Sequence, residues 1–137
     1  MKNYIINGKA IEITLENGTT LKETTPSESS ATIRERVIQA RTLQQQRFAE
    51  YNKTAKTPIH CNAQMTPKLV RTYCALDAAG DKLLAYSMDK LGLSARAYDR
   101  ILKVARTIAD LAGSENICST HLMEAISYRN LDRSDWL

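Results

Sequence analysis

Four basic side chains interrupt one alanine-rich, otherwise apolar stretch, residues 93–113 (LSARAYDRILKVARTIADLAG): Arg96, Arg100, Lys103 and Arg106. The first three are spaced i, i+4 and i+7, which places them on one face of a helix. Such a stripe can bind an anion, because an arginine in the first helical turn adds bidentate donors to the free backbone N–H groups there. The stretch therefore contains a candidate phosphate site, with Arg96 nearest the helix N-terminus.

The same spacing also fits a solvated face of an amphipathic helix, and periodicity alone favours that interpretation. The opposite, core-facing side would then carry Ile101, Val104, Ala105 and Ile108. Asp99 and Asp110 flank the stripe and could pair with it, although exposed pairs of this kind contribute little. Spacing by itself leaves both interpretations open.

Helices are the elements that must position these side chains. Capping residues and apolar spacing predict helices from about Ser30 to Tyr51, from Thr66 to Tyr73, from Asp77 to Leu91, from Ser94 to Gly113 and from Ser119 onward. The last helix is expected to turn Leu122, Met123, Ala125 and Ile126 inward. Aromatic residues make up only 6% of the chain, so the core must consist mainly of aliphatic side chains, which suits helix packing. We expect a mainly α fold, a bundle of four to five helices with short connections.

The first 26 residues have a different pattern from the rest. Apolar and polar residues alternate around Asn7-Gly8 and Asn17-Gly18, and Asn-Gly between alternating segments indicates a β-hairpin. Strands are predicted near residues 3–6, 10–15 and 19–22. The expected organisation is a β-hairpin or linker segment at 1–26, a helical domain at 27–131 and a tail at 132–137.

Composition limits the possible functions. The net charge of +4 permits an anionic partner without demonstrating one, and the three cysteines contain no CxxC pair. No run of residues is long and apolar enough to cross a membrane, so a cytoplasmic protein without a membrane partner is expected. No G-x-x-x-x-G-K-[ST] loop occurs in the 137 residues, so this chain alone should not hydrolyse ATP.

Two other groups of residues could in principle form sites. His60, Cys61, Cys74, Cys118 and His121 could be imagined as zinc ligands, but they come from distant segments, and no metal is expected. The helix over 30–51 carries Arg34, Arg36, Arg41 and Arg47, which fit a solvated face better than a contact with DNA or a neighbouring subunit. Thr32 and Glu35 fit a capping box at its start.

Several blocks in one order resemble a known family. They are ESSATIRERVIQAR, CNAQM, YCALDAAGDKLL, GLSARAYDRILKVARTIADLAGSENI and HLMEAISYR, which together cover roughly residues 27–131. These blocks are similar to the C-terminal domain of the Mg-chelatase-like AAA+ ATPases, the bacterial group of ComM- and YifB-type competence proteins. The resemblance does not extend clearly to the first 26 residues.

The resemblance implies a fold, a site and partners. The domain would be the helical lid that follows an ATP-binding core in a ring-forming homo-oligomer, and the whole protein would be a DNA branch-migration helicase. Arg96 matches the sensor-2 arginine that reaches the γ-phosphate of ATP, and Arg100 and Lys103 are weaker nucleotide-binding candidates. ATP and Mg²⁺ would be bound mainly by a core that lies outside this chain, so no catalytic residue is assigned within it.

One alternative belongs to another class of protein. A stand-alone helical module could bind nucleic acid directly through the basic face of the 94–113 helix. The chain would then need no ATP-binding core for its activity.

Overall fold

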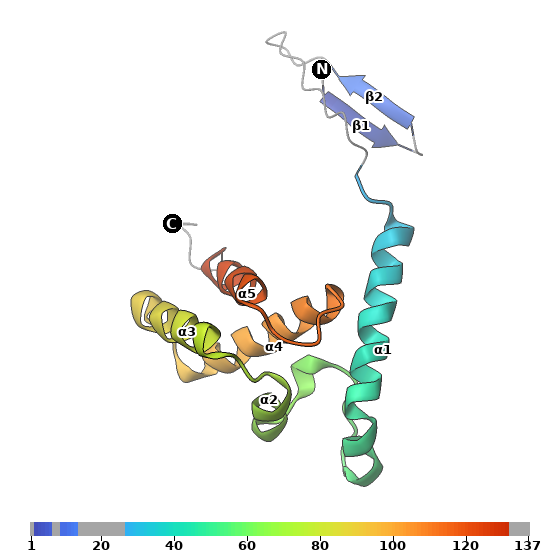
Figure 1. Cartoon of the computed structure of the whole chain (residues 1–137). Coiled ribbons are helices and arrows are strands. Elements are labelled where there is room, and N and C mark those ends of the chain that lie inside the picture. Colours follow the sequence, from blue (N-terminus) through green and yellow to red (C-terminus); the bar gives the residue numbers. More distant parts are fainter. Residues whose placement is uncertain (1, 7–8, 14–26, 132–137) are drawn as a thin grey trace. The chain divides into compact units, whose positions relative to one another are not determined.

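Two short strands lie near the N-terminus of the chain. Strand β1 (Lys2–Ile6) pairs antiparallel with β2 (Lys9–Ile13), with Tyr4 opposite Ile11 (Figure 1). They overlap the segments predicted as strands at 3–6 and 10–15.

The computed structural model describes residues 2–6, 9–13 and 27–131. The two predicted Asn-Gly turns, the predicted strand at 19–22 and the tail at 132–137 lie outside these residues. The chain falls into two units, residues 1–35 and 36–137, and the hairpin belongs to the first.

Helices form nearly all of the second unit. In chain order the elements are α1 (Ser30–Thr54), which begins in the first unit, the short 3₁₀ turn η1 (Asn62–Gln64), α2 (Pro67–Tyr73), α3 (Ala78–Leu91), α4 (Ala95–Leu111) and α5 (Ser119–Leu131). The mainly α fold and the five helices agree with the prediction from sequence.

Side-chain caps start three of the helices, as the sequence predicted. The hydroxyl of Thr66 accepts from the Leu69 N–H, the carboxylate of Asp77 from the Gly80 N–H, and the hydroxyl of Ser94 from the Ala97 N–H. Each satisfies a backbone donor that lacks a partner inside its helix. Helix α4, which carries the basic stripe, is therefore fixed at its first turn.

Glycines end α3 and the turn after α4. Gly92 (φ 60°) and Gly113 (φ 68°) both adopt the left-handed conformation, which costs a residue with a Cβ more than it costs glycine. The Ser114 N–H donates back to the Ala109 carbonyl at 2.8 Å, which closes the end of α4 and directs the chain into α5.

The predicted caps of α1 and α5 are wrong in position. The hydroxyl of Ser29, not that of Thr32, accepts the N–H at the start of α1, since Thr32 N donates to Ser29 Oγ at 3.2 Å. Helix α5 already includes Ser119, and the N–H of the preceding Cys118 donates to Nδ1 of His121 at 3.0 Å. The side chain that bonds to the backbone at this helix start is therefore His121 and not Ser119.

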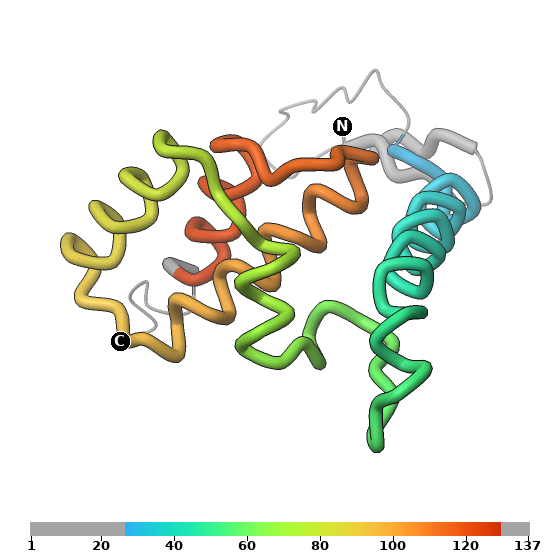
Figure 2. Tube along the Cα trace, turned by 60° about the horizontal axis from the view of Figure 1, so that its bottom comes forward, coloured from blue at the N-terminus to red at the C-terminus, as the bar shows by residue number. Residues whose placement is uncertain are grey.

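Helix α4 is the central element of the second unit. It packs against α5, η1 and α2, and α3 packs against α5 (Figure 2). The fully buried side chains Phe48, Leu84 and Leu122 come from α1, α3 and α5, so a single core joins helices that are distant in sequence. The ring of Phe48 meets that of Tyr73 edge-to-face, with 6.1 Å between the ring centres.

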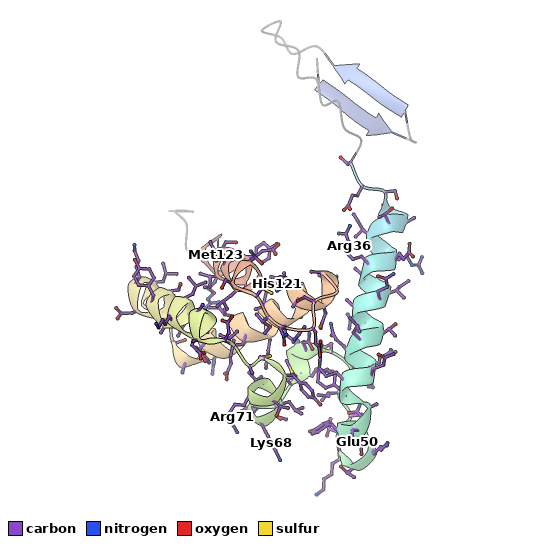
Figure 3. The ribbon with its side chains drawn as sticks, in the orientation of Figure 1. Arg36, Glu50, Lys68, Arg71, His121 and Met123 are labelled. Carbon is purple, nitrogen blue, oxygen red and sulfur yellow. The ribbon has the colours of Figure 1, made fainter. Side chains whose placement is uncertain are left out.

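Two apolar residues point outward against expectation. Met123 of α5 is 59% exposed and Val104 of α4 is 40% exposed (Figure 3 labels Met123). Both helices bury their core faces through other positions, including Leu122, Ala125 and Ile101.

None of the helices in the described part of the chain combines the length and the apolar character that a membrane span requires.

Replacing Phe48 tests how far α1 depends on this core. Phe48→Ala should lower the free energy of unfolding by about 3–5 kcal/mol, because it removes a buried ring and leaves a cavity. Urea unfolding followed by circular dichroism measures the loss. Ile38→Ala on the same helix is the matched control, since Ile38 is exposed, and it should change stability by less than about 0.5 kcal/mol. Equal losses in the two variants would contradict the packing described.

Candidate functional site

The first turn of α4 carries the leading phosphate-binding candidate. Arg96 follows the Ser94 cap by two residues, and its side chain is exposed. No hydrogen bond or ion pair joins the Arg96 side chain to the rest of the described chain. The guanidinium therefore stands at the positive end of the helix dipole, where an anion is favoured.

The other two members of the basic stripe have different surroundings. The ammonium of Lys103 donates to the Ala63 carbonyl in η1 at 3.3 Å. Arg100 is exposed and lines a shallow groove between α4 and α5. The stripe is therefore continuous along α4, but its three cations do not converge on a single pocket.

Arg106 does not belong to the exposed stripe. It is buried, and its two terminal nitrogens donate to the carbonyls of Ser114 at 2.7 Å and Glu115 at 2.8 Å. One of them also lies 3.2 Å from the carboxylate of Asp110. Arg106 therefore holds the turn between α4 and α5, and it is not available to a ligand as a free cation.

A buried ion pair joins α1 to α4. Arg47 binds both carboxylate oxygens of Asp110, with N–O distances of 2.6 and 2.8 Å. The side chain of Asp110 is 1% exposed and that of Arg47 13%. Asp110 was expected to pair, if at all, with an exposed stripe on its own helix. Arg47 was expected on a solvated face, and this expectation is wrong.

Asn62 of η1 completes this buried cluster. Its amide oxygen accepts from Arg47 at 2.9 Å, and its amide nitrogen donates to Asp110 at 2.8 Å and to Thr107 at 3.1 Å. Its backbone N–H donates to the side chain of Gln44 at 3.1 Å. Three separate segments, α1, η1 and α4, are thus joined by one polar network.

The charges of the cluster keep each other ionised. Burial by itself would raise the pKa of the Asp110 carboxyl, but hydrogen bonds from Arg47 and Asn62, with the charges of Arg47 and Arg106, outweigh it and hold that pKa below its usual value. The hydrogen bond to Asp110 raises the pKa of Arg47. The cluster stays charged at neutral pH.

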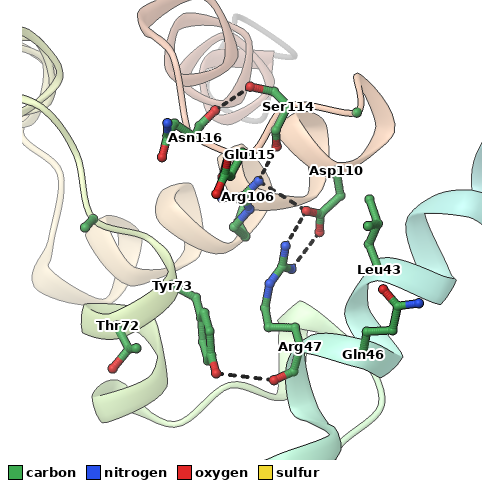
Figure 4. Close-up of a pocket in the computed structure, with 12 residues that line it drawn as sticks. Leu43, Gln46, Arg47, Thr72, Tyr73, Arg106, Asp110, Ser114, Glu115 and Asn116 are labelled. Carbon is green, nitrogen blue, oxygen red and sulfur yellow. Dashed lines mark hydrogen bonds and ion pairs between the residues drawn. The ribbon is translucent and has the colours of Figure 1, made fainter.

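An open groove lies over the cluster. It has a volume of about 640 Å³, and Arg47, Tyr73, Arg106, Asp110 and Ser114 are among the residues that line it (Figure 4). The hydroxyl of Tyr73 donates to the Arg47 carbonyl at 3.2 Å, and the Arg47 guanidinium lies 5.8 Å from the centre of the Tyr73 ring. These contacts position the Arg47 side chain at the base of the groove.

The imagined metal ligands are not brought together. No set of three or more metal-binding side chains gathers within residues 27–131 or the two strands. Cys74 is buried, and burial raises the pKa of its thiol to about 11, so it carries no reactive thiolate at neutral pH. Nδ1 of His121 accepts the Cys118 N–H at 3.0 Å.

Sequence reasoning missed the buried cluster, although one signal for it was present. Ala40, Gln44, Arg47 and Phe48 follow the spacing i, i+4, i+7 and i+8, which places Arg47 on the buried face of α1. A charged residue on such a face needs a partner of opposite sign. The sequence could have predicted that need, but not that Asp110, 63 residues later, supplies the partner.

The described helices form a small, mainly α domain with the basic helix α4 at its centre. Residues 27–129 match the sequence model of one family, described as magnesium chelatase, subunit ChlI C-terminal. The match covers most of the chain, and the chain belongs to this family.

Two bacterial proteins illustrate the relationship. YifB of Escherichia coli K12 is 43% identical over 112 residues, which is 82% of this chain and 20% of YifB. The competence protein ComM of Haemophilus influenzae is 41% identical over 106 residues, 77% of this chain and 19% of ComM. The chain thus spans about a fifth of the length of these relatives and corresponds to the C-terminal lid domain of a Mg-chelatase-like protein.

Removing the charge of Asp110 should destabilise the fold strongly. Asp110→Asn keeps the shape of the side chain but leaves the buried Arg106 and the largely buried Arg47 without their carboxylate, and breaking such a pair costs about 3–5 kcal/mol. The free energy of unfolding at pH 7, measured in urea, should fall by this amount. Asp89→Asn on α3 is the control, because Asp89 is exposed and its replacement should have little effect.

The loss in free energy of unfolding caused by Asp110→Asn should also depend on pH. Because folding lowers the pKa of Asp110, its contribution is fully present above the unfolded value of about 3.9 and is lost as the pH falls through the lower folded value. The gap between wild type and Asp110→Asn should therefore narrow below about pH 4. A gap that stays constant down to acid unfolding would contradict the assignment.

Proposed function

We propose that the chain serves as the lid of an AAA+ ATPase and that Arg96 is its sensor-2 arginine, which contacts the γ-phosphate of ATP. The observation that carries this proposal is the position of Arg96 in the first turn of α4. Its guanidinium is exposed there, has no partner among the described residues, and stands beside backbone N–H groups that already favour an anion.

The anchoring of α4 supports this role. A phosphate sensor must hold its charge in a fixed position, because a preorganised donor stabilises developing charge without reorganising. Helix α4 is capped by Ser94 at its first turn and held near its last turn by the pairing of Asp110 with Arg47. A lid that moves as a rigid body would then carry Arg96 toward or away from the nucleotide.

The two weaker candidates fit nucleotide binding less well. Lys103 already donates to a carbonyl of η1, and Arg100 faces the α4–α5 groove. We assign the γ-phosphate contact to Arg96 and only secondary roles to Arg100 and Lys103. ATP and Mg²⁺ would be held mainly by a core outside this chain, so the chain alone should not hydrolyse ATP.

The wider activity follows from the relatives by analogy. One relative is named a competence protein, and we propose a cytoplasmic ring of identical subunits that uses ATP to drive branch migration of DNA. The lid would contact the ATPase core of its own polypeptide and a neighbouring subunit in the ring.

Replacing Arg96 tests the sensor assignment. In a polypeptide that joins this chain to its ATP-binding core, Arg96→Ala should reduce kcat for ATP hydrolysis roughly a hundredfold, the effect typical of removing one transition-state donor. Arg96→Lys should recover only part of the rate, because an ammonium cannot bind phosphate bidentately.

Lys82→Ala is the matched control for Arg96→Ala. Lys82 is an exposed cation on α3, so its loss should leave kcat unchanged. ATP hydrolysis by Arg96→Ala at the normal rate would contradict the sensor assignment. Thermal unfolding of each variant shows whether the fold is kept.

A second candidate function rests on the basic face of α4, where Arg96 and Arg100 are exposed. A stand-alone nucleic-acid-binding module should bind duplex DNA as this isolated chain, with an affinity that falls steeply as salt rises. Fluorescence anisotropy with labelled DNA at low and moderate salt measures this. We expect no tight binding by the isolated chain, and strong salt-dependent binding would favour the module over the lid.

A further inference from the structure

The groove between α4 and α5 combines apolar walls with a basic edge. It has a volume of about 190 Å³. The residues that line it are Arg100, Ile101, Val104, Ala125, Tyr128 and Arg129. Pockets for drug-sized ligands typically measure ~300–1,000 Å³. This groove therefore suits one inserted side chain better than a whole nucleotide.

Part of the apolar lining remains exposed. Val104 is 40% exposed and Tyr128 49%, whereas Ile101 and Ala125 are buried. The Tyr128 hydroxyl donates to the Glu124 carboxylate at 2.6 Å, which ties the ring to its own helix. Exposed apolar surface bordered by polar groups is typical of protein-binding sites, and tyrosine and arginine are enriched among the residues that dominate the binding energy there. The groove therefore has the composition of a protein-binding site.

The charge of the groove favours an acidic occupant. The two charged side chains that line it, Arg100 and Arg129, are both cations. Arg100 is exposed and makes no hydrogen bond or ion pair within the part of the chain that the structure describes. A carboxylate beside Arg100 would therefore gain a charge-assisted hydrogen bond without displacing a protein partner.

The spacing of Arg100 and Val104 indicates the form of the occupant. The two residues are four positions apart on α4, so they lie about one turn apart on one face of the helix. Side chains three or four positions apart on a second helix are neighbours in the same way. An amphipathic helix can thus place an apolar side chain against Val104 and a carboxylate against Arg100 at the same time.

Nucleic acid suits this groove less well. A phosphate could contact Arg100, but the side chains of Ile101, Val104 and Ala125 carry no hydrogen-bonding group for a sugar or a base edge. Covering them with a polar backbone would bury little apolar surface on both sides of the contact, so the hydrophobic gain would be small. The lining therefore favours a protein.

We propose that the α4–α5 groove binds an acidic amphipathic helix of a partner protein. A large apolar side chain of that helix lies against Val104 and Tyr128, and a carboxylate one turn away pairs with Arg100. This gives Arg100 a role separate from the γ-phosphate contact proposed for Arg96. The interaction does not rest on the proposed function, because it requires neither nucleotide nor the residue assigned to it.

Selection from a peptide library tests the chemistry of the occupant. A phage library of random dodecapeptides would be selected on the immobilised 137-residue chain. Enriched peptides should combine a large apolar residue with Asp or Glu three or four positions away, the spacing of neighbours on a helix. Enrichment of peptides without this combination would overturn the proposal, as would a failure to enrich any.

Substitutions show whether the enriched peptides bind in the groove. Arg100→Glu and Val104→Glu should each raise the Kd of a synthetic enriched peptide about tenfold, measured by fluorescence anisotropy. Both residues are exposed, so circular dichroism should show unchanged helix content. Arg41→Glu and Met123→Glu are the matched controls, because these residues are exposed outside the groove, and they should leave Kd unchanged. Equal affinity for all four variants would overturn the proposal.

A charge exchange tests the pairing with Arg100. An enriched peptide whose acidic residue is replaced by Lys should bind Arg100→Glu about tenfold more tightly than it binds the wild-type chain. If the replaced peptide shows no preference for Arg100→Glu, the proposed ion pair is wrong.

Three further measurements distinguish other occupants of the groove. DNA oligonucleotides should not displace the peptide, sedimentation should give the same mass for wild type and Arg100→Glu, and the peptide should still bind when the chain is joined to its ATP-binding core. Displacement by DNA would indicate a nucleic-acid site, and an oligomer lost in Arg100→Glu would indicate a second copy. Loss of peptide binding in the joined polypeptide would indicate the core. Each of these results would overturn the proposal, and none of them depends on the rate of ATP hydrolysis.

Discussion

The buried pairing of Arg47 with Asp110 is the interaction on which the arrangement of this domain depends. It joins α1 to α4 through two short N–O contacts, although the two residues are 63 positions apart in the sequence. Asn62 forms a hydrogen bond with each partner and so joins η1 to the same network. A buried ion pair is not in itself a guarantee of stability, because both charges must first lose their hydration. Its clearest effect here is to fix which surfaces of α1, η1 and α4 meet.

The pairing of Arg47 with Asp110 matters for the proposed function because α4 carries Arg96, the residue proposed to bind phosphate. Arg96 lies in the first turn of this helix and Asp110 near its end, so the pairing that fixes one end also limits the orientation of the other. Arg106 adds to this by holding the carbonyls of the turn into α5. The helix is thus held by side-chain contacts at both ends, which the proposed role of Arg96 requires because a phosphate-binding charge must be held in position.

Local features of the fold could be predicted from the sequence, and long-range pairings could not. Thr66, Asp77, Ser94 and Gly92 act as caps where their types and positions indicate, because capping depends on a few neighbouring residues. Val104 and Met123 were placed inside because periodicity identifies an apolar stripe without saying how wide the covered face is. Arg47 and Asp110 were placed on the surface because nothing local identifies a partner 63 residues away. The family relationship supplied the candidate role of Arg96, which spacing alone left undecided.

The shared network of Arg47, Asn62 and Asp110 also restricts how such a sequence can diverge. Each of the three side chains satisfies the other two, so a change at one position leaves buried polar groups without partners at the others. Neutral drift at single positions is therefore unfavourable, and viable change requires concerted replacement at three points that are far apart in the sequence. Among relatives of this chain, these positions should vary together or not at all.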